Sequence, residues 1–141
     1  MTEQAMTFLA EVNEPNVKVH LDSYHMNIEE RSMRQAVLTC GDSLGYVHVG
    51  ESHRGALGTG SVNFVELFWG LAEIDYVGPI TFESFSDKVV SKQLSNTLCV
   101  WRTMWEENEP LAKGARDYIE RCIEASKVAK DPNVEPVGDW F

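Results

Sequence analysis

Three residues whose side chains can bind a metal ion lie at the ends of three successive strand-like stretches. Asp22 comes at the end of VKVHLDS, His48 lies in LGYVHVG, and Glu83 comes at the end of VGPITFES. Two carboxylates and one imidazole, with no thiolate, suit Mn²⁺, Mg²⁺ or Co²⁺ better than a structural zinc ion. The pattern therefore predicts a divalent-metal site, and Mn²⁺ is the first expectation.

Each of these residues also has an ordinary structural interpretation. An aspartate after a strand is often a helix cap, a single histidine can be a hydrogen-bonded core residue, and Glu83 could be half of an ion pair. All three nevertheless occupy matching positions in successive units. Because ligands of parallel α/β folds bind at the carboxyl ends of the strands, this matching placement favours one shared metal site.

Two further polar residues follow these strand ends. His25 lies in LDSYHMN and Arg54 lies in HVGESHRG. Either side chain could bond the hydroxyl or carbonyl oxygens of a polyol substrate, and a solvated loop is the alternative. The glycines around Arg54 do not form a phosphate-binding loop, since the chain contains no GxxxxGK[ST] motif.

The order of elements indicates an α/β fold of about three parallel strand–helix units. Apolar spacing predicts helices over 2–12, around 28–40, around 64–71 and over 111–128. It also predicts a helix before the last one, with Leu98, Trp101 and Trp105 on one face. Core packing is the expected role of Trp101 and Trp105. Alternation predicts strands in 17–23, 44–50 and 77–85. Strands that alternate with helices run parallel, and three strands cannot close a barrel.

Length and composition fit one domain over residues 1–141, with an irregular tail over 129–141. The net charge of -10 argues against a nucleic-acid partner, because a phosphate backbone requires a basic patch. No apolar run is long enough for a membrane span and no secretory signal is evident. Three widely spaced cysteines fit reduced thiols, so a cytoplasmic location is expected.

Three segments together resemble a known family. VKVHLDSYHMNIEE, LGYVHVGESHRG and GPITFESFS are similar, in order and spacing, to the last three strand units of the D-tagatose 3-epimerase (D-psicose 3-epimerase) family. These proteins are xylose-isomerase-like TIM-barrel sugar epimerases. The resemblance covers nearly the whole chain and implies the C-terminal part of such a barrel.

The resemblance implies roles for the five residues named above. Asp22, His48 and Glu83 match three of the family's four metal ligands, and Glu83 also matches one of its two catalytic glutamates. His25 and Arg54 match residues that contact the substrate. The implied reaction is epimerisation at C3 of a ketose, in which proton abstraction beside the carbonyl gives an enediolate that is protonated again on its opposite face.

One family ligand has no counterpart here. The other catalytic glutamate and the first five strands would fall before Met1, so this chain alone is expected to be impaired. The open sheet is expected to expose unpaired edges and an apolar face, and hence to form a homo-oligomer or to bind a complementary N-terminal half-barrel. Two alternatives remain: another sugar isomerase or dehydratase of the same superfamily, and a non-catalytic half-barrel that acts as an oligomeric structural or binding module.

Overall fold

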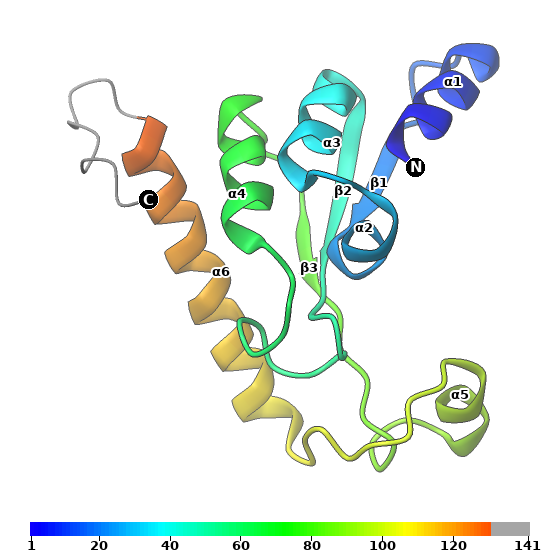
Figure 1. Ribbon diagram of the computed structural model, residues 1–141, viewed down its shortest axis with the longest axis vertical. Helices are drawn as coiled ribbons and strands as arrows, with labels where there is room; N and C mark the ends of the chain where they lie inside the picture. The colour runs from blue at the N-terminus through cyan, green and yellow to red at the C-terminus, as the bar shows by residue number, and fades with distance from the viewer. Residues whose placement is uncertain (131–141) are drawn as a thin grey trace.

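The computed structural model describes residues 1–130 and shows one open sheet with helices around it (Figure 1). The elements in chain order are α1 (Thr2–Val12), β1 (Val19–Asp22), α2 (Ser23–Glu29), α3 (Met33–Cys40), the short 3-10 helix η1 (Gly41–Ser43), β2 (Leu44–Val49), α4 (Phe64–Glu73), β3 (Ile80–Phe82), α5 (Lys92–Thr97) and α6 (Asn108–Lys130).

The three strands form a parallel sheet in the order β1-β2-β3. Asp22 stands opposite His48 in the register, and His48 stands opposite Thr81. Helices cross over between successive strands, as in an arc of a (β/α) barrel. The α/β fold with about three parallel strand–helix units is therefore confirmed.

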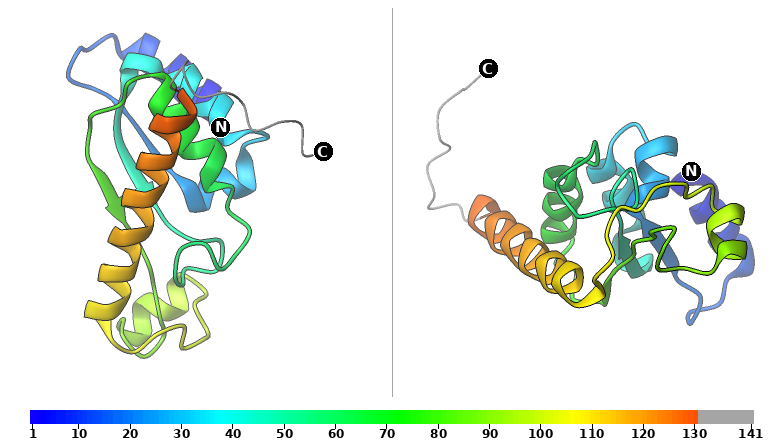
Figure 2. Two further views of the ribbon diagram at one scale, coloured as in Figure 1. Left: turned by 90° about the vertical axis from the view of Figure 1, so that its left-hand side faces the viewer. Right: turned by 90° about the horizontal axis from the view of Figure 1, so that it is seen from below.

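Helices cover one face of this sheet and leave the other face open (Figure 2). Successive side chains of a strand point to opposite faces, so every second residue meets the helices. Val19 and Leu21 of β1 and Val47 and Val49 of β2 are buried in this way. They form one core with the buried side chains of the two central helices, namely Met33, Ala36, Val37 and Cys40 of α3 and Phe64, Leu67, Phe68 and Leu71 of α4.

The open face of the sheet is polar, so the prediction of an apolar face is wrong. His20 and Thr81 are exposed on it, and Tyr46 is half-buried between them. The hydroxyl groups of Tyr46 and Thr81 lie 2.6 Å apart and share a hydrogen bond. Hydrophobic attraction from this face therefore gives no reason for the chain to associate, although β1 and β3 each keep one unpaired edge within residues 1–130.

The helix predicted around residues 28–40 is in fact two helices. α2 begins directly after β1, because Asp22 caps its first turn, and it ends where Glu30 turns extended. Ser32 then starts α3, and its hydroxyl accepts a hydrogen bond from the backbone N–H of Gln35 at 3.2 Å. The new cap interrupts the apolar spacing that suggested one continuous helix.

The helix predicted on the face with Leu98, Trp101 and Trp105 is absent from the described residues. α5 ends at Thr97, and Cys99 adopts a left-handed backbone with φ of 55°, a conformation common just after a helix end. The N–H of Val100 then donates to the carbonyl of Ser95 at 2.9 Å, which closes the helix end.

Trp101 and Trp105 lie in a loop and not in a helix. Trp101 is 64% exposed, so its expected role in core packing is wrong. Trp105 is half-buried, and its indole N–H donates to the hydroxyl of Ser84 at 2.8 Å. Buried Ser86 holds the base of this loop, because its hydroxyl donates to the carbonyl of Trp105 at 2.6 Å.

The last helix is longer than expected. α6 runs from Asn108 to Lys130, so residues 129 and 130 of the predicted irregular tail are helical, and the rest of that tail lies outside the described residues. Within residues 1–130, no helix combines the length and apolar character that a membrane crossing requires.

Candidate metal centre and substrate groove

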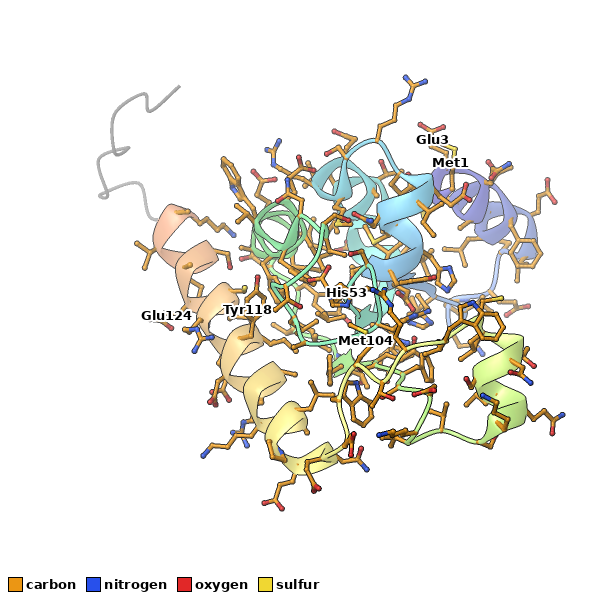
Figure 3. The ribbon with its side chains drawn as sticks, turned by 60° about the horizontal axis from the view of Figure 1, so that its bottom comes forward. Met1, Glu3, His53, Met104, Tyr118 and Glu124 are labelled. Carbon is orange, nitrogen blue, oxygen red and sulfur yellow. The ribbon has the colours of Figure 1, made fainter. Side chains whose placement is uncertain are left out.

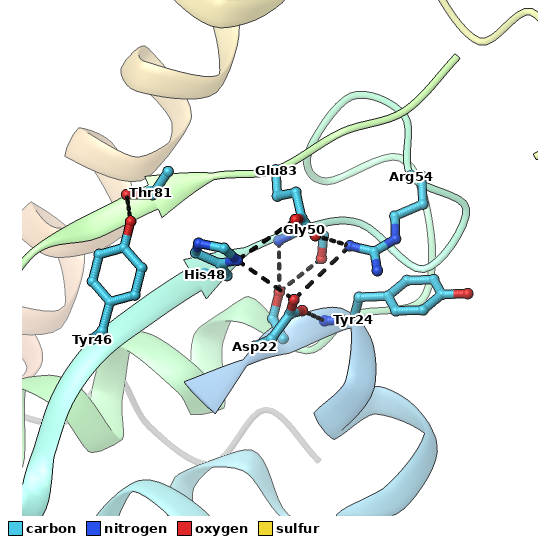
Figure 4. Close-up of polar contacts among 9 residues, drawn as sticks. Asp22, Tyr24, Tyr46, His48, Gly50, Arg54, Thr81 and Glu83 are labelled. Atoms are coloured by element: carbon cyan, nitrogen blue, oxygen red, sulfur yellow. Dashed lines mark hydrogen bonds and ion pairs between the residues drawn. The ribbon is translucent and has the colours of Figure 1, made fainter. Parts of the chain in front are cut away.

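The three predicted ligands meet at the carboxyl ends of the strands. Asp22 is the last residue of β1, His48 lies near the end of β2, and Glu83 directly follows β3. Their side chains point toward one another on the open face (Figure 4). One donor atom from each residue lies within 4.8 Å of the other two, and no other such group of metal-binding side chains occurs among residues 1–130.

A buried serine ties two of these strand ends together. The hydroxyl of Ser23 donates to the carbonyl of Gly50 at 2.7 Å and accepts from the N–H of Gly50 at 2.8 Å. Ser23 follows Asp22 and Gly50 follows the strand that carries His48. This double contact fixes the two ligands relative to each other, since neither strand end can slide without breaking it.

Each carboxylate has one oxygen held by the protein and one directed at the centre. The Oδ1 atom of Asp22 accepts from the N–H of Tyr24 at 2.8 Å, and its Oδ2 atom lies 3.8 Å from Nδ1 of His48. The Oε2 atom of Glu83 pairs with Arg54 at 2.5 Å, and its Oε1 atom lies 3.7 Å from the same Nδ1. Two carboxylate oxygens and one imidazole nitrogen are therefore left facing one another.

This donor set fits a divalent cation. An ion bound about 2.1–2.6 Å from each ligand keeps its ligand atoms within about 5 Å of one another, and the three donor atoms meet that limit. The side chains of Asp22, His48 and Glu83 are 11%, 21% and 29% exposed, so the centre is sheltered yet open to solvent on one side. Asp22 is thus both a helix cap and a candidate ligand, and the two interpretations do not exclude each other.

Arg54 lies beside this centre. Its side chain is mostly buried, and its guanidinium carbon lies 3.6 Å from the centre of the Tyr24 ring and 5.2 Å from that of the Phe85 ring. The Nη1 atom is 4.0 Å from the Oδ2 atom of Asp22, in addition to its pairing with Glu83. Arg54 therefore presents a positive charge at the edge of the metal site, where a substrate oxygen could accept a hydrogen bond.

His25 lies on helix α2 and not in a loop. Its ring is exposed and meets the Tyr24 ring edge-on, with the ring centres 5.2 Å apart. A groove of about 570 Å³ connects it with the metal site. The groove is lined by polar and apolar side chains, among them His25, Asp22, His48, Arg54, Glu83, Phe85 and Leu98.

Sequence reasoning missed His20. Its ring lies edge-on to that of His48 with centres 4.3 Å apart, and it also lines the groove. Burial and then the neighbouring imidazole of His48 lower the pKa of His20. The alternation in VKVHLD contained the signal, because residues two positions apart in a strand share a face, so His20 had to lie on the same face as Asp22.

The fold and the site define a class of protein. Parallel strand–helix units that carry polar ligands at the carboxyl ends of their strands are the building pattern of enzymes with a (β/α) barrel. The sequence profile of the xylose isomerase-like TIM barrel family matches residues 2–122. The chain belongs to this family.

Two relatives with high sequence identity to this chain are named as 3-epimerases. The chain is 58% identical over 118 residues to the L-ribulose 3-epimerase of Methylomonas sp. (strain DH-1), with 84% of this chain and 41% of the relative covered. It is 50% identical over 124 residues to the ketose 3-epimerase of Arthrobacter globiformis, with 88% and 43% covered. The chain thus spans about two fifths of the length of these relatives.

A solved structure agrees with this relation. The crystal structure of D-allulose 3-epimerase from Methylomonas sp. in complex with D-allulose aligns with a TM-score of 0.83 at 56% identity, and the alignment covers 86% of this chain and 42% of that one. The predicted resemblance to the 3-epimerase family is confirmed.

Proposed function

We propose that this chain carries the metal-binding and proton-abstracting part of a ketose 3-epimerase. One observation supports the proposal above all: the free donor atoms of Asp22, His48 and Glu83 converge beside Arg54 in one groove. The similarity to proteins named L-ribulose 3-epimerase and ketose 3-epimerase indicates a ketose as the substrate class.

Asp22, His48 and Glu83 would hold a divalent cation. Two carboxylates suit Mn²⁺ or Mg²⁺, and the imidazole favours Mn²⁺ or Co²⁺ over Mg²⁺, so Mn²⁺ suits both kinds of ligand. The chemistry that such a cation supplies is polarisation of the ketose carbonyl and stabilisation of negative charge on its oxygen. The hydrogen on the neighbouring carbon is only weakly acidic without that help.

Glu83 is the proposed catalytic base. Its carboxylate lies at the carboxyl end of β3, faces the groove, and is 29% exposed, so a substrate carbon can approach it. Arg54 holds the second oxygen of this carboxylate and so fixes its direction. Arg54 and His25 are the proposed substrate-binding residues, because both line the groove and both can donate to a carbonyl or hydroxyl oxygen.

Inversion at C3 needs a second acid–base group on the opposite face of the enediolate. Within residues 1–130, Glu3 and Glu11 do not supply it, since both are exposed on α1 and neither joins the metal-binding group (Figure 3 labels Glu3). We therefore propose that full epimerisation requires a complementary half-barrel or a second copy of the chain, whereas exchange of the C3 proton in the metal-loaded chain requires no acid–base group besides Glu83.

The experiment is a deuterium exchange assay. The chain is incubated with Mn²⁺ and either D-allulose or L-ribulose in D₂O, and proton NMR follows both the C3 signal and the appearance of the epimer. The proposal expects deuterium at C3 with retained configuration, abolished by a chelator. Absence of exchange for both sugars in the metal-loaded chain would contradict it and favour the non-catalytic binding module. A parallel incubation with an aldose separates the third alternative, because exchange at the aldose and at neither ketose would favour a different isomerase of the superfamily.

A further inference from the structure

Glu51 is a fully buried carboxylate that belongs neither to the metal centre nor to any ion pair described for residues 1–130. Its exposed fraction is 0%. It is the second residue of the loop that joins β2 to α4, after Gly50, and lies three residues before Arg54. A charged side chain is rarely buried unless other groups compensate its charge.

The partners of Glu51 are backbone N–H groups of its own loop. Its Oε1 atom accepts from the N–H of Ser52 at 2.8 Å and from that of Val62 at 3.3 Å, and its Oε2 atom accepts from the N–H of Gly58 at 2.9 Å. Burial alone raises the pKa of Glu51, but these hydrogen bonds outweigh it and leave the pKa lowered. The carboxylate is thus a buried anion that ties Ser52, near the start of the loop, to Gly58 and Val62, near its end.

Two glycines of the loop are closely packed against other side chains. A Cβ atom at Gly60 would overlap the Glu51 carboxylate and the Ser52 hydroxyl. Gly58 has a positive φ of 78°, and a Cβ atom there would lie 2.6 Å from the Tyr118 ring, which reaches toward the loop from α6 (Figure 3). A side chain at either position would therefore force a neighbouring side chain to move, and at Gly58 it would also strain the backbone.

Arg54 depends on this loop for its direction. Its backbone is left-handed, with φ of 62°, which a residue with a long side chain rarely adopts. Its N–H donates to the carbonyl of Glu51 at 2.8 Å, and its own carbonyl accepts from the N–H of Phe85 at 3.1 Å and from the hydroxyl of Ser84. The backbone of Arg54 is thus clamped between the Glu51 turn and the end of β3.

The guanidinium group of Arg54 lies over the Tyr24 ring and pairs with the carboxylate of Glu83. A loop released from Glu51 would let Arg54 return to a relaxed backbone, and the guanidinium would then leave the groove. We infer that Glu51 is a positioning residue: it folds the loop over residues 51–62 so that Arg54 faces the substrate groove. This inference rests on the proposed function only where sugar binding is concerned.

The first test compares Glu51→Gln with Glu66→Gln, which alters a half-buried carboxylate that caps α3 outside the loop. A glutamine has only one acceptor oxygen, so at least one loop N–H loses its partner. Amide exchange at Ser52, Gly58 and Val62 should accelerate at least about tenfold in Glu51→Gln, and the Arg54 Nε–H resonance should shift. Neither should change in Glu66→Gln.

The second test is a double-mutant cycle with Arg54→Ala, read by calorimetric titration of D-allulose or L-ribulose into the Mn²⁺-loaded chain. Glu51→Gln should weaken sugar binding about 10-fold or more but add nothing in the Arg54→Ala background, and the Mn²⁺ affinity should stay within about twofold. An equal further loss in that background, or unchanged amide exchange, would overturn the inference.

Failure of the proposed function can be distinguished from failure of the inference about Glu51. If the unsubstituted chain binds neither sugar, the proposed function fails, and the amide exchange together with the Arg54 resonance decides on Glu51. If Glu51→Gln does not fold, Gly60→Ala serves instead, because its methyl group displaces the same carboxylate without changing its charge. Gly60→Ala should reproduce the faster exchange and the shifted Arg54 resonance, and an unaffected loop would overturn the inference.

Discussion

The two faces of the three-stranded sheet carry different kinds of side chain. Toward the helices, β1 and β2 present Val19, Leu21, Val47 and Val49, all buried. Toward the open face they present His20, Asp22, Tyr46 and His48. Alternation along a strand separates the residues that hold the fold from those that can bind a metal. The largest losses of stability are therefore expected from substitutions on the covered face, and the largest losses of metal binding and proton transfer from substitutions on the open face.

Glu83→Gln should give the largest effect on the open face. The amide cannot accept the C3 proton, so deuterium exchange of the ketose should slow by about 10²–10⁴-fold. Urea unfolding of the same variant should show a smaller loss of stability than a core truncation does. Exchange at the original rate would remove Glu83 from the mechanism.

Leu67→Ala tests the covered face. Leu67 on α4 is fully buried in the core over the sheet, so its truncation leaves a cavity and should lower the free energy of unfolding by about 2–5 kcal/mol. Urea titration measures the loss, and Mn²⁺ titration below the unfolding range should show an unchanged affinity. A variant that loses metal affinity while it is still folded would contradict the separation of the two faces.

Cys40, on the covered side of the sheet, should make the stability of the chain depend on pH in the alkaline range. Burial raises the pKa of the Cys40 thiol on α3 to about 11. The folded pKa lies above the unfolded one, so the thiol contributes stability that is fully present below about pH 8.5 and is lost as the pH rises through the folded value. Urea unfolding between pH 8 and 11 should show a decline that Cys40→Ala lacks. Matching declines in the two proteins would refute this assignment.

Tyr46→Phe should have the smallest effect. It removes the hydrogen bond to Thr81 on the open face, and a loss of about 0.5–1.5 kcal/mol is expected. The aromatic contact with His48 is retained, because phenylalanine keeps the ring. Urea unfolding and Mn²⁺ titration together give the result, and a large change in metal affinity would mean that the Tyr46 hydroxyl acts on the site itself.

The periodic parts of the chain could be predicted from sequence. Parallel strands and the meeting of Asp22, His48 and Glu83 follow from the alternation of strands with helices and from the common edge of parallel strands. The region of Leu98 and Trp101 could not be predicted, because its apolar spacing imitates a helix while the left-handed Cys99 ends α5.

Local hydrogen bonds account for the other failures. Glu51 carries no signal of its burial, since only the folded loop brings the N–H groups of Gly58 and Val62 to it. The split between α2 and α3 likewise depends on the Ser32 cap, which a continuous apolar pattern conceals. Periodicity predicts which face a residue occupies, but not which backbone groups a loop gathers around a charge.

The shared metal centre can be tested by titration of the chain with Mn²⁺, read by calorimetry and electron paramagnetic resonance. We expect one ion per chain, an affinity lowered at least about tenfold in each of Asp22→Asn, His48→Gln and Glu83→Gln, and no change in Glu66→Gln. No bound ion, or an affinity that none of the three substitutions alters, would contradict the claim that these strand ends form one metal centre.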